Sequence, residues 1–219
     1  MNRDEIAFMG RMTARMTHEI RNILAILKES SGLISDILSL NKDSSFPHRE
    51  KMESSLSRIQ AQIPRGMDLL TQFNRLAHSV DESDVQIEIN DFLDHVITLM
   101  ECFARLKKVE LKILPADAPI SFKTDPFPFH WMIASCIDYV LREAPEGSAI
   151  KISTRKEKKN LKVHISIGAN DEKEITSSDI KDTLPQELAY LEPSLKALRS
   201  RIFVIDALES KGILVDIEI

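Results

Sequence analysis

A histidine, a carboxylate and an amide lie within about one helical turn in the segment His18-Glu19-Ile20-Arg21-Asn22. An exposed neutral imidazole can act as a nucleophile or as a base near neutral pH. Asn22, one turn after His18, can hold a water molecule or a phosphoryl oxygen beside the ring. Arg11, Arg15 and Arg21 add positive charge that favours an incoming phosphoryl group or an acidic partner. The residue types are compatible with phosphoryl transfer through His18, and also with an ordinary surface histidine.

The spacing around His18 predicts that its side chain faces solvent. Met16 and Ile20 belong to the apolar seam of a predicted helix, and His18 lies two residues from each, about 200° around the helix axis. The small residues Ala14 and Ala25 share the face of His18 and leave room for a docked surface. We therefore expect a reactive face with a partner-binding surface around it.

Two long helices are expected to carry this face, over residues 4–40 and about 49–79, because apolar residues recur there every three, four or seven positions. The predicted seams are Met9, Met16, Ile20, Ile23, Leu27, Ile34 and Ile37, and then Met52, Leu56, Ile59, Ile63, Met67, Leu70, Phe73 and Ala77. A polar turn at 41–47 joins the helices, and Pro64 predicts a kink. A two-helix hairpin is too narrow to bury both seams, so we expect a homodimer that forms a four-helix bundle.

A second domain is expected after the acidic hinge at 81–84. Alternating apolar residues predict strands, and longer periodic stretches predict helices. The expected strands are 85–89, 109–114, 150–154, 161–165, 202–208 and 213–219, and the expected helices are 90–107, 127–143 and 184–200. The predicted fold class is α+β, with a helical hairpin at 1–80 and an α/β sandwich at 85–219 whose sheet is covered by helices on one face.

Composition restricts the possible partners. A hydrophobic content of 43% and a charged content of 29% are typical of a globular protein. The net charge of −5 argues against a nucleic-acid or anionic-lipid partner. No long apolar run or signal-peptide pattern is present, and the two cysteines form no CxxC pair, so we expect a cytoplasmic protein. The histidines other than His18 lack metal-ligand spacing, and no metal site is expected.

Glycine is scarce: the chain has 6, whereas average usage would give about 15. No two of them lie close together in the sequence. Loops that wrap nucleotide phosphates need closely spaced glycines, so that backbone N–H groups can approach the anion. The composition therefore excludes a P-loop or a dinucleotide-binding fold.

Residues 15–24, Arg-Met-Thr-His-Glu-Ile-Arg-Asn-Ile-Leu, resemble the phosphoacceptor segment in the dimerisation and phosphotransfer domain of bacterial sensor histidine kinases. In that family the segment opens a helical hairpin that dimerises into a four-helix bundle. The resemblance implies that His18 takes the phosphoryl group, that Glu19 assists transfer, and that Asn22 positions water for dephosphorylation of the partner. Ile23 departs from the family, which commonly has a proline there.

The resemblance extends over most of the chain, and it implies that 85–219 is similar to the ATP-binding α/β sandwich of these kinases. The similar segments are 73–77, 124–126, 146–152, 201–204 and 210–215. The family's nucleotide-binding residues are absent, however. Tyr139, next to Asp138, stands where the family has its Mg²⁺-coordinating asparagine, residues 167–171 replace the adenine-reading Asp-x-Gly-x-Gly motif, and residues 183–188 replace the glycine-rich lid without a glycine. We therefore expect that the chain binds no ATP, cofactor or metal itself.

Taken together, the resemblance is closest to dimeric histidine phosphotransferases built on a kinase scaffold. Such a relay protein would accept a phosphoryl group on His18 from a response-regulator receiver aspartate and pass it to another receiver, with Mg²⁺ supplied by the receiver. A histidine kinase is a further candidate partner. Three alternatives stay open: a receiver phosphatase that uses Asn22, an inactive pseudo-kinase scaffold, and an ATP-dependent kinase with an unusual nucleotide site.

Overall fold

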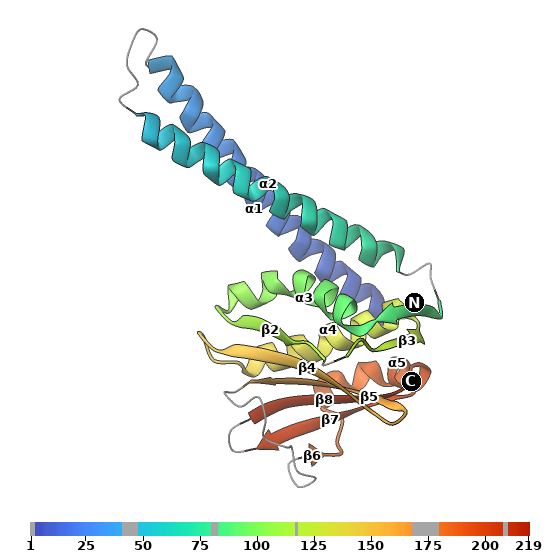
Figure 1. Ribbon diagram of the computed structural model, residues 1–219. Coiled ribbons are helices and arrows are strands. Elements are labelled where there is room, and N and C mark those ends of the chain that lie inside the picture. The colour runs from blue at the N-terminus through green and yellow to red at the C-terminus, as the bar shows by residue number, and fades with distance from the viewer. Residues whose placement is uncertain (1–2, 41–47, 80–82, 117, 168–179, 208–209) are drawn as a thin grey trace. The chain divides into compact units, whose positions relative to one another are not determined.

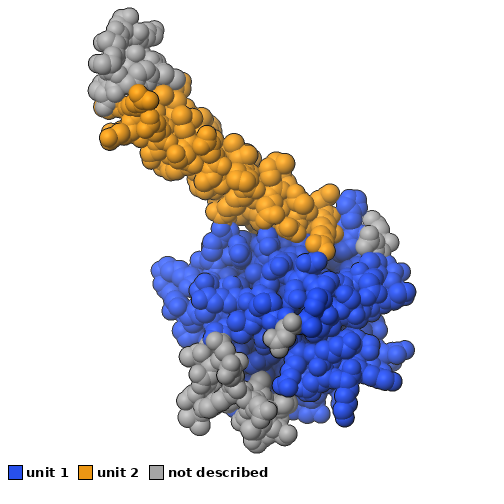
Figure 2. Space-filling view, viewed as in Figure 1, with its two compact units in different colours: residues 1–5, 76–219 blue, residues 6–75 orange. Residues whose placement is uncertain are grey.

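The computed structural model describes residues 3–40, 48–79, 83–116, 118–167, 180–207 and 210–219. Contacts within the chain divide it into two compact units, which Figure 2 colours separately. One unit comprises residues 6–75, and the other comprises residues 1–5 and 76–219. In the part of the chain that the structure describes, no helix is long and apolar enough to cross a membrane.

The first unit is a helical hairpin built from α1 (Arg3–Leu40) and α2 (Arg49–His78), which lie side by side in Figure 1. Helix α1 continues through its Ser-Ser-Gly stretch, and α2 continues through Pro64. Met16, Ile23 and Ile37 are buried, as the predicted seam of the first helix requires. These positions, together with the buried Ser30, are seven residues apart and define the side of α1 that faces α2.

The predicted seam of the second helix was wrong in part. Met52, Ile59 and Phe73 are half-buried, whereas the five other members of that seam are exposed: Leu56 (43%), Ile63 (51%), Met67 (61%), Leu70 (48%) and Ala77. The residues of α2 nearest to α1 include Ser55, Leu69 and Gly66, and a Cβ on Gly66 would lie 3.4 Å from Ile23. Two rows one residue apart both fit a seven-residue repeat, and only packing against α1 distinguishes them.

The second unit contains a six-stranded sheet with the order β2-β4-β5-β8-β7-β6. Its strands are β2 (Glu110–Leu114), β4 (Ala149–Glu157), β5 (Asn160–Ile167), β6 (Ile180–Lys181), β7 (Ser200–Ala207) and β8 (Ser210–Glu218). Neighbouring strands are antiparallel except β2 and β4, which are parallel. A separate antiparallel pair is formed by β1 (Val85–Glu88) and β3 (Ser121–Thr124). The unit is thus α+β with a mixed sheet.

The core of this unit lies between the sheet and its helices, α3 (Ile89–Leu106), α4 (Pro126–Glu143) and α5 (Glu192–Ala197). Alternate residues of the central strands are fully buried, among them Ile152, Val163 and Val215. Helix α4 contributes the single tryptophan, Trp131, which is 0% exposed. Burial of every second strand residue against helices gives the predicted layer arrangement.

Three features of this unit differ from what the sequence predicts. The expected helix over 184–200 is a 3₁₀ helix, η1 (Gln186–Leu191), followed by the short α5, because Pro185 and Pro193 interrupt a continuous helix. Asn90 does not cap α3; instead Glu88 accepts a hydrogen bond from the Asp91 N–H at 3.0 Å. Strands β3 and β6 were not predicted, because each is short and becomes a strand only by pairing with β1 or β7.

Gly212 generates a stability prediction, because it lies in β8 opposite Ser166 of β5 and Ile205 of β7. A Cβ there would collide with the Ile165 carbonyl oxygen and lie 2.7 Å from Ser166 Cα. These backbone atoms cannot move without breaking the β-ladder. We expect Gly212→Ala to lower the free energy of unfolding of this unit by about 2–3 kcal/mol, measured by urea titration of Trp131 fluorescence.

Gly32→Ala is the matched control, because no atom lies within 4 Å of a Cβ at Gly32 in α1. That substitution should stabilise the hairpin by roughly 0.5–1 kcal/mol, as alanine favours a helix interior over glycine. Circular dichroism at a helix wavelength reports this change. An unfolding midpoint of Gly212→Ala equal to that of the wild type contradicts the prediction.

Candidate functional site

His18 lies within α1, and its side chain is exposed. Its orientation follows from the residues on the other side of the helix: Met16 is 1% exposed and Ile23 is 4% exposed. Because these side chains are fixed toward α2, His18 must point away from the hairpin interior. The imidazole is therefore accessible to a partner, as its spacing from Met16 and Ile20 predicts.

Asn22 lies beside the imidazole, with its Nδ2 atom 3.2 Å from His18 Nδ1. Residues four apart face each other on a helix, which explains the contact. In this orientation the amide donates to Nδ1 and the ring proton is on Nε2. With the amide turned over, its oxygen accepts the Nδ1 proton and Nε2 keeps a free lone pair. Asn22 thus occupies the Nδ1 side of the ring, and Nε2 is the nitrogen available for reaction in the orientation in which the amide oxygen faces Nδ1.

Glu19 points in a different direction from His18, because adjacent helical residues lie about 100° apart. Its side chain is only 17% exposed, and its Oε1 atom accepts a hydrogen bond from Arg65 Nη2 of α2 at 2.5 Å. The Glu19 carboxylate, which the resemblance expects to assist transfer, is therefore paired with Arg65. Arg65 was missed in the sequence, since it lies 46 residues from Glu19 and only the antiparallel register of the hairpin brings them together.

The other predicted site residues surround this group on α1. Arg15, Arg21 and Ala25 are exposed. Arg11 and Ala14 belong to α1, but their side chains lie outside the described residues. The structure thus brings His18, Asn22 and the Glu19–Arg65 pair into two consecutive helical turns, with exposed arginines before and after the histidine.

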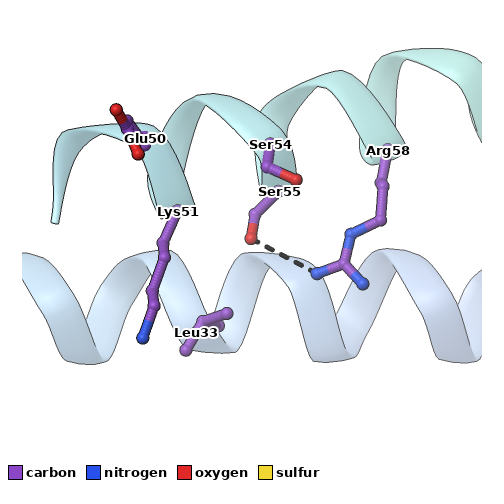
Figure 3. Close-up of a pocket in the computed structure, with 6 residues that line it drawn as sticks. All are labelled: Leu33, Glu50, Lys51, Ser54, Ser55 and Arg58. Atoms are coloured by element: carbon purple, nitrogen blue, oxygen red, sulfur yellow. Dashed lines mark hydrogen bonds between the residues drawn. The ribbon is translucent and has the colours of Figure 1, made fainter.

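A shallow pocket of about 340 Å³ lies between α1 and α2 toward the loop end of the hairpin, as Figure 3 shows. It is lined by Leu33, Glu50, Lys51, Ser54, Ser55 and Arg58. Arg58 Nη2 donates a hydrogen bond to Ser55 Oγ at 3.4 Å. Leu33 follows His18 by about 15 residues, or roughly 22 Å along the helix. This pocket is therefore separate from the His18 site.

The sandwich has a cavity of about 210 Å³ between α4 and the ends of the central strands. Its lining includes Tyr139, Glu143, Asp206 and Lys211 beside the apolar Val140, Ile167, Val204 and Ile205. Burial, together with the nearby Glu187 and Glu143 carboxylates, raises the pKa of Tyr139 above its usual value. Asp138, next to Tyr139, accepts a hydrogen bond at its Oδ2 atom from Arg142 Nη2 at 2.6 Å. The cavity lining thus carries both signs of charge, because Lys211 lies beside Glu143 and Asp206, and Asp206 is also paired with Lys181 at 2.6 Å.

The region that would correspond to a nucleotide lid forms a helix that is anchored in the core. Residues 186–191 form η1, and its Leu188 and Leu191 are buried in the core of the unit. A leucine-anchored 3₁₀ helix does not present a row of N–H donors to an anion. The segment 167–171, which the resemblance aligns with the adenine-reading motif, lies outside the described residues apart from Ile167. Within the described residues, η1 thus does not fit a glycine-rich phosphate lid.

Other titratable residues of this unit belong to its core. His95 and His130 are buried with their rings 5.2 Å apart, and burial lowers the pKa of His164 to about 4, so that its ring is neutral at physiological pH. Burial raises the pKa of the Cys136 thiol far above its usual value, which makes it unreactive. No group of three or more potential ligands among the described residues could hold a metal ion.

Comparison with known proteins gives a match in structure but not in sequence. No protein-family model matches the chain, and no curated protein matches it. A histidine kinase from Burkholderia phymatum STM815 superposes with a TM-score of 0.51 at 11% identity, covering 95% of this chain and 97% of that one. The histidine kinase ThkA, solved in complex with the response regulator protein TrrA, gives a TM-score of 0.50 at 15% identity, covering 99% of this chain and 63% of that one. The chain therefore has the fold of the histidine kinase core.

Proposed function

We propose that the chain is a two-component phosphorelay protein, which accepts a phosphoryl group on His18 from a response-regulator receiver aspartate and passes it to a second receiver. The observation that carries the proposal is an exposed imidazole whose Nδ1 side is occupied by Asn22, 3.2 Å away, on a helical hairpin. The kinase-like fold and the resemblance of residues 15–24 to a phosphoacceptor segment support it.

The transfer step follows from the arrangement of this face. With the Asn22 oxygen accepting the Nδ1 proton, neutral His18 attacks phosphorus through the Nε2 lone pair. A P–N bond forms while the P–O bond to the receiver aspartate breaks, and the aspartate leaves as a carboxylate. The ring keeps its Nδ1 proton and carries one positive charge. Arg15 and Arg21 offset the phosphoryl charge, and Mg²⁺ is expected to arrive in the receiver's own acidic pocket.

The relay makes a direct prediction about His18. Incubation with a ³²P-labelled receiver should transfer an acid-labile label to the wild-type chain, and His18→Ala should abolish that transfer, because the P–N bond needs this nitrogen. His48→Ala is the matched control, since His48 is also exposed in the hairpin and should retain full labelling. The readout is gel autoradiography before and after acid treatment.

Three results contradict this relay. Label that persists on His18→Ala places the acceptor elsewhere in the chain. Labelling by γ-³²P-ATP alone, without any receiver, identifies a kinase with an unusual nucleotide site instead. Receiver binding with no labelling of the wild type indicates a scaffold.

The exposed Asn22 amide favours a second candidate function, dephosphorylation of the receiver. An amide at this position can orient a water molecule for attack on phosphoaspartate, which releases phosphate without labelling His18. We expect Asn22→Ala to abolish any release of inorganic phosphate and to slow transfer to His18 only a few-fold. Phosphate release and chain labelling are followed in the same reaction. Loss of labelling without loss of phosphate release contradicts this assignment.

We also propose that the chain functions as a homodimer. Three of the exposed apolar residues on α2 follow, by one position each, residues on the α1 side of the helix: Leu56 after Ser55, Ile63 after Gln62, and Leu70 after Leu69. One residue is 100° around a helix, which is the direction of a second neighbour in a four-helix bundle. Met67 extends this stripe, and a stripe of this kind is typical of a protein interface.

A charged substitution in the stripe tests the dimer. Ile63→Glu would place a carboxylate in the apolar interface, so we expect sedimentation velocity to show a monomer in place of a dimer at micromolar concentration. Ser57→Glu adds the same charge at an exposed position outside the stripe and should leave the dimer intact. A monomeric wild type, or an Ile63→Glu variant that remains dimeric, contradicts the proposal.

A further inference from the structure

Arg65 of α2 forms a hydrogen-bonded ion pair with Glu19, which is a predicted catalytic residue. The Arg65 side chain is 38% exposed and the Glu19 side chain 17% exposed, so the pair is more sheltered from water than an ordinary surface pair. A carboxylate that has lost most of its hydration requires a partner charge or hydrogen bonds. Arg65 supplies both from the other helix.

This pairing matters because Glu19 is the residue next to His18. The proposed reaction brings a phosphoryl group with two negative charges to the imidazole. An unpaired carboxylate on the adjacent residue would repel that group, and the repulsion is only partly screened at this distance. Arg15 and Arg21 lie within four residues of Glu19 on α1, and Asp68 lies three residues after Arg65 on α2; all three side chains are exposed.

We infer that Arg65 is a positioning residue of the phosphoacceptor site, acting through Glu19. Its guanidinium cancels the charge of the Glu19 carboxylate and holds that carboxylate on the α2 side of α1. The Nδ1 side of the ring is then left to the neutral amide of Asn22. The role of Arg65 rests on the proposed function, since it concerns the rate at which His18 accepts a phosphoryl group.

The test measures the rate of His18 phosphorylation with two donors, a phosphorylated receiver and the small molecule phosphoramidate. Arg65→Gln removes the Arg65 charge from the Glu19 carboxylate, and the rate should fall roughly three- to tenfold with both donors. With the receiver, kcat should fall while KM stays within about twofold, because the inferred role of Arg65 is exerted on His18 through Glu19 and not on receiver binding. Arg65→Lys keeps the charge and should stay within about twofold of the wild type.

The double variant Glu19→Gln with Arg65→Gln distinguishes action through Glu19 from a direct role. Because Glu19 is itself a predicted catalytic residue, the double variant is compared with the single variant Glu19→Gln. Once the Glu19 charge is removed, loss of Arg65 should change the rate by less than about twofold. Arg75→Gln is the matched control: Arg75 is exposed on the same helix, ten residues away, and its loss should have no effect. Circular dichroism of every variant checks that the hairpin is folded.

Each outcome decides the inference. An unchanged rate in Arg65→Gln overturns it. So does a double variant that is several-fold slower than Glu19→Gln, or an Arg65→Lys variant that is as slow as Arg65→Gln. If phosphoramidate labels the wild type but no receiver does, the relay is wrong. The rates measured with phosphoramidate then still test the role of Arg65. If neither donor labels His18, the relay and the role of Arg65 both fall.

Discussion

Helices α1 and α2 meet along a row of residues that includes several small side chains. Ser30 and Ser55 are both 1% exposed, and Gly66 lies opposite Ile23. This contact fixes the rotation of each helix about its axis, and every functional feature of the hairpin depends on that rotation. His18 faces outward because Met16 and Ile23 face α2, and Leu56, Ile63 and Leu70 form an outer stripe because the residues before them face α1.

The two units differ in the charge that they present at the places where chemistry is expected. The His18 face has exposed arginines, and Glu19, the residue next to His18, is paired with Arg65. The cavity near Tyr139 is lined by Glu143, Asp206 and Lys211, and burial, together with the Glu187 and Glu143 carboxylates, raises the pKa of the phenol. The proposed relay places the phosphoryl group on the hairpin.

Residues with strong local periodicity were predicted well, and residues whose state depends on distant partners were not. The long helices were located to within about two residues, because a seam of 30 or more residues needs no tertiary information. The short strands β3 and β6 and the 3₁₀ helix η1 were missed or misassigned. A strand of two to four residues has no detectable period, and prolines limit where a helix can continue without defining what replaces it.

The sequence by itself determined the exposed histidine, its amide neighbour at Asn22 and the helical hairpin that carries them, because residues three to seven positions apart on one helix have a fixed angular relation. Only the tertiary structure decided which apolar row of α2 faces α1, and that Arg65 pairs with Glu19. Both outcomes depend on the register of two antiparallel helices. That register is fixed by side-chain packing across the hairpin, which no pattern within a single helix contains.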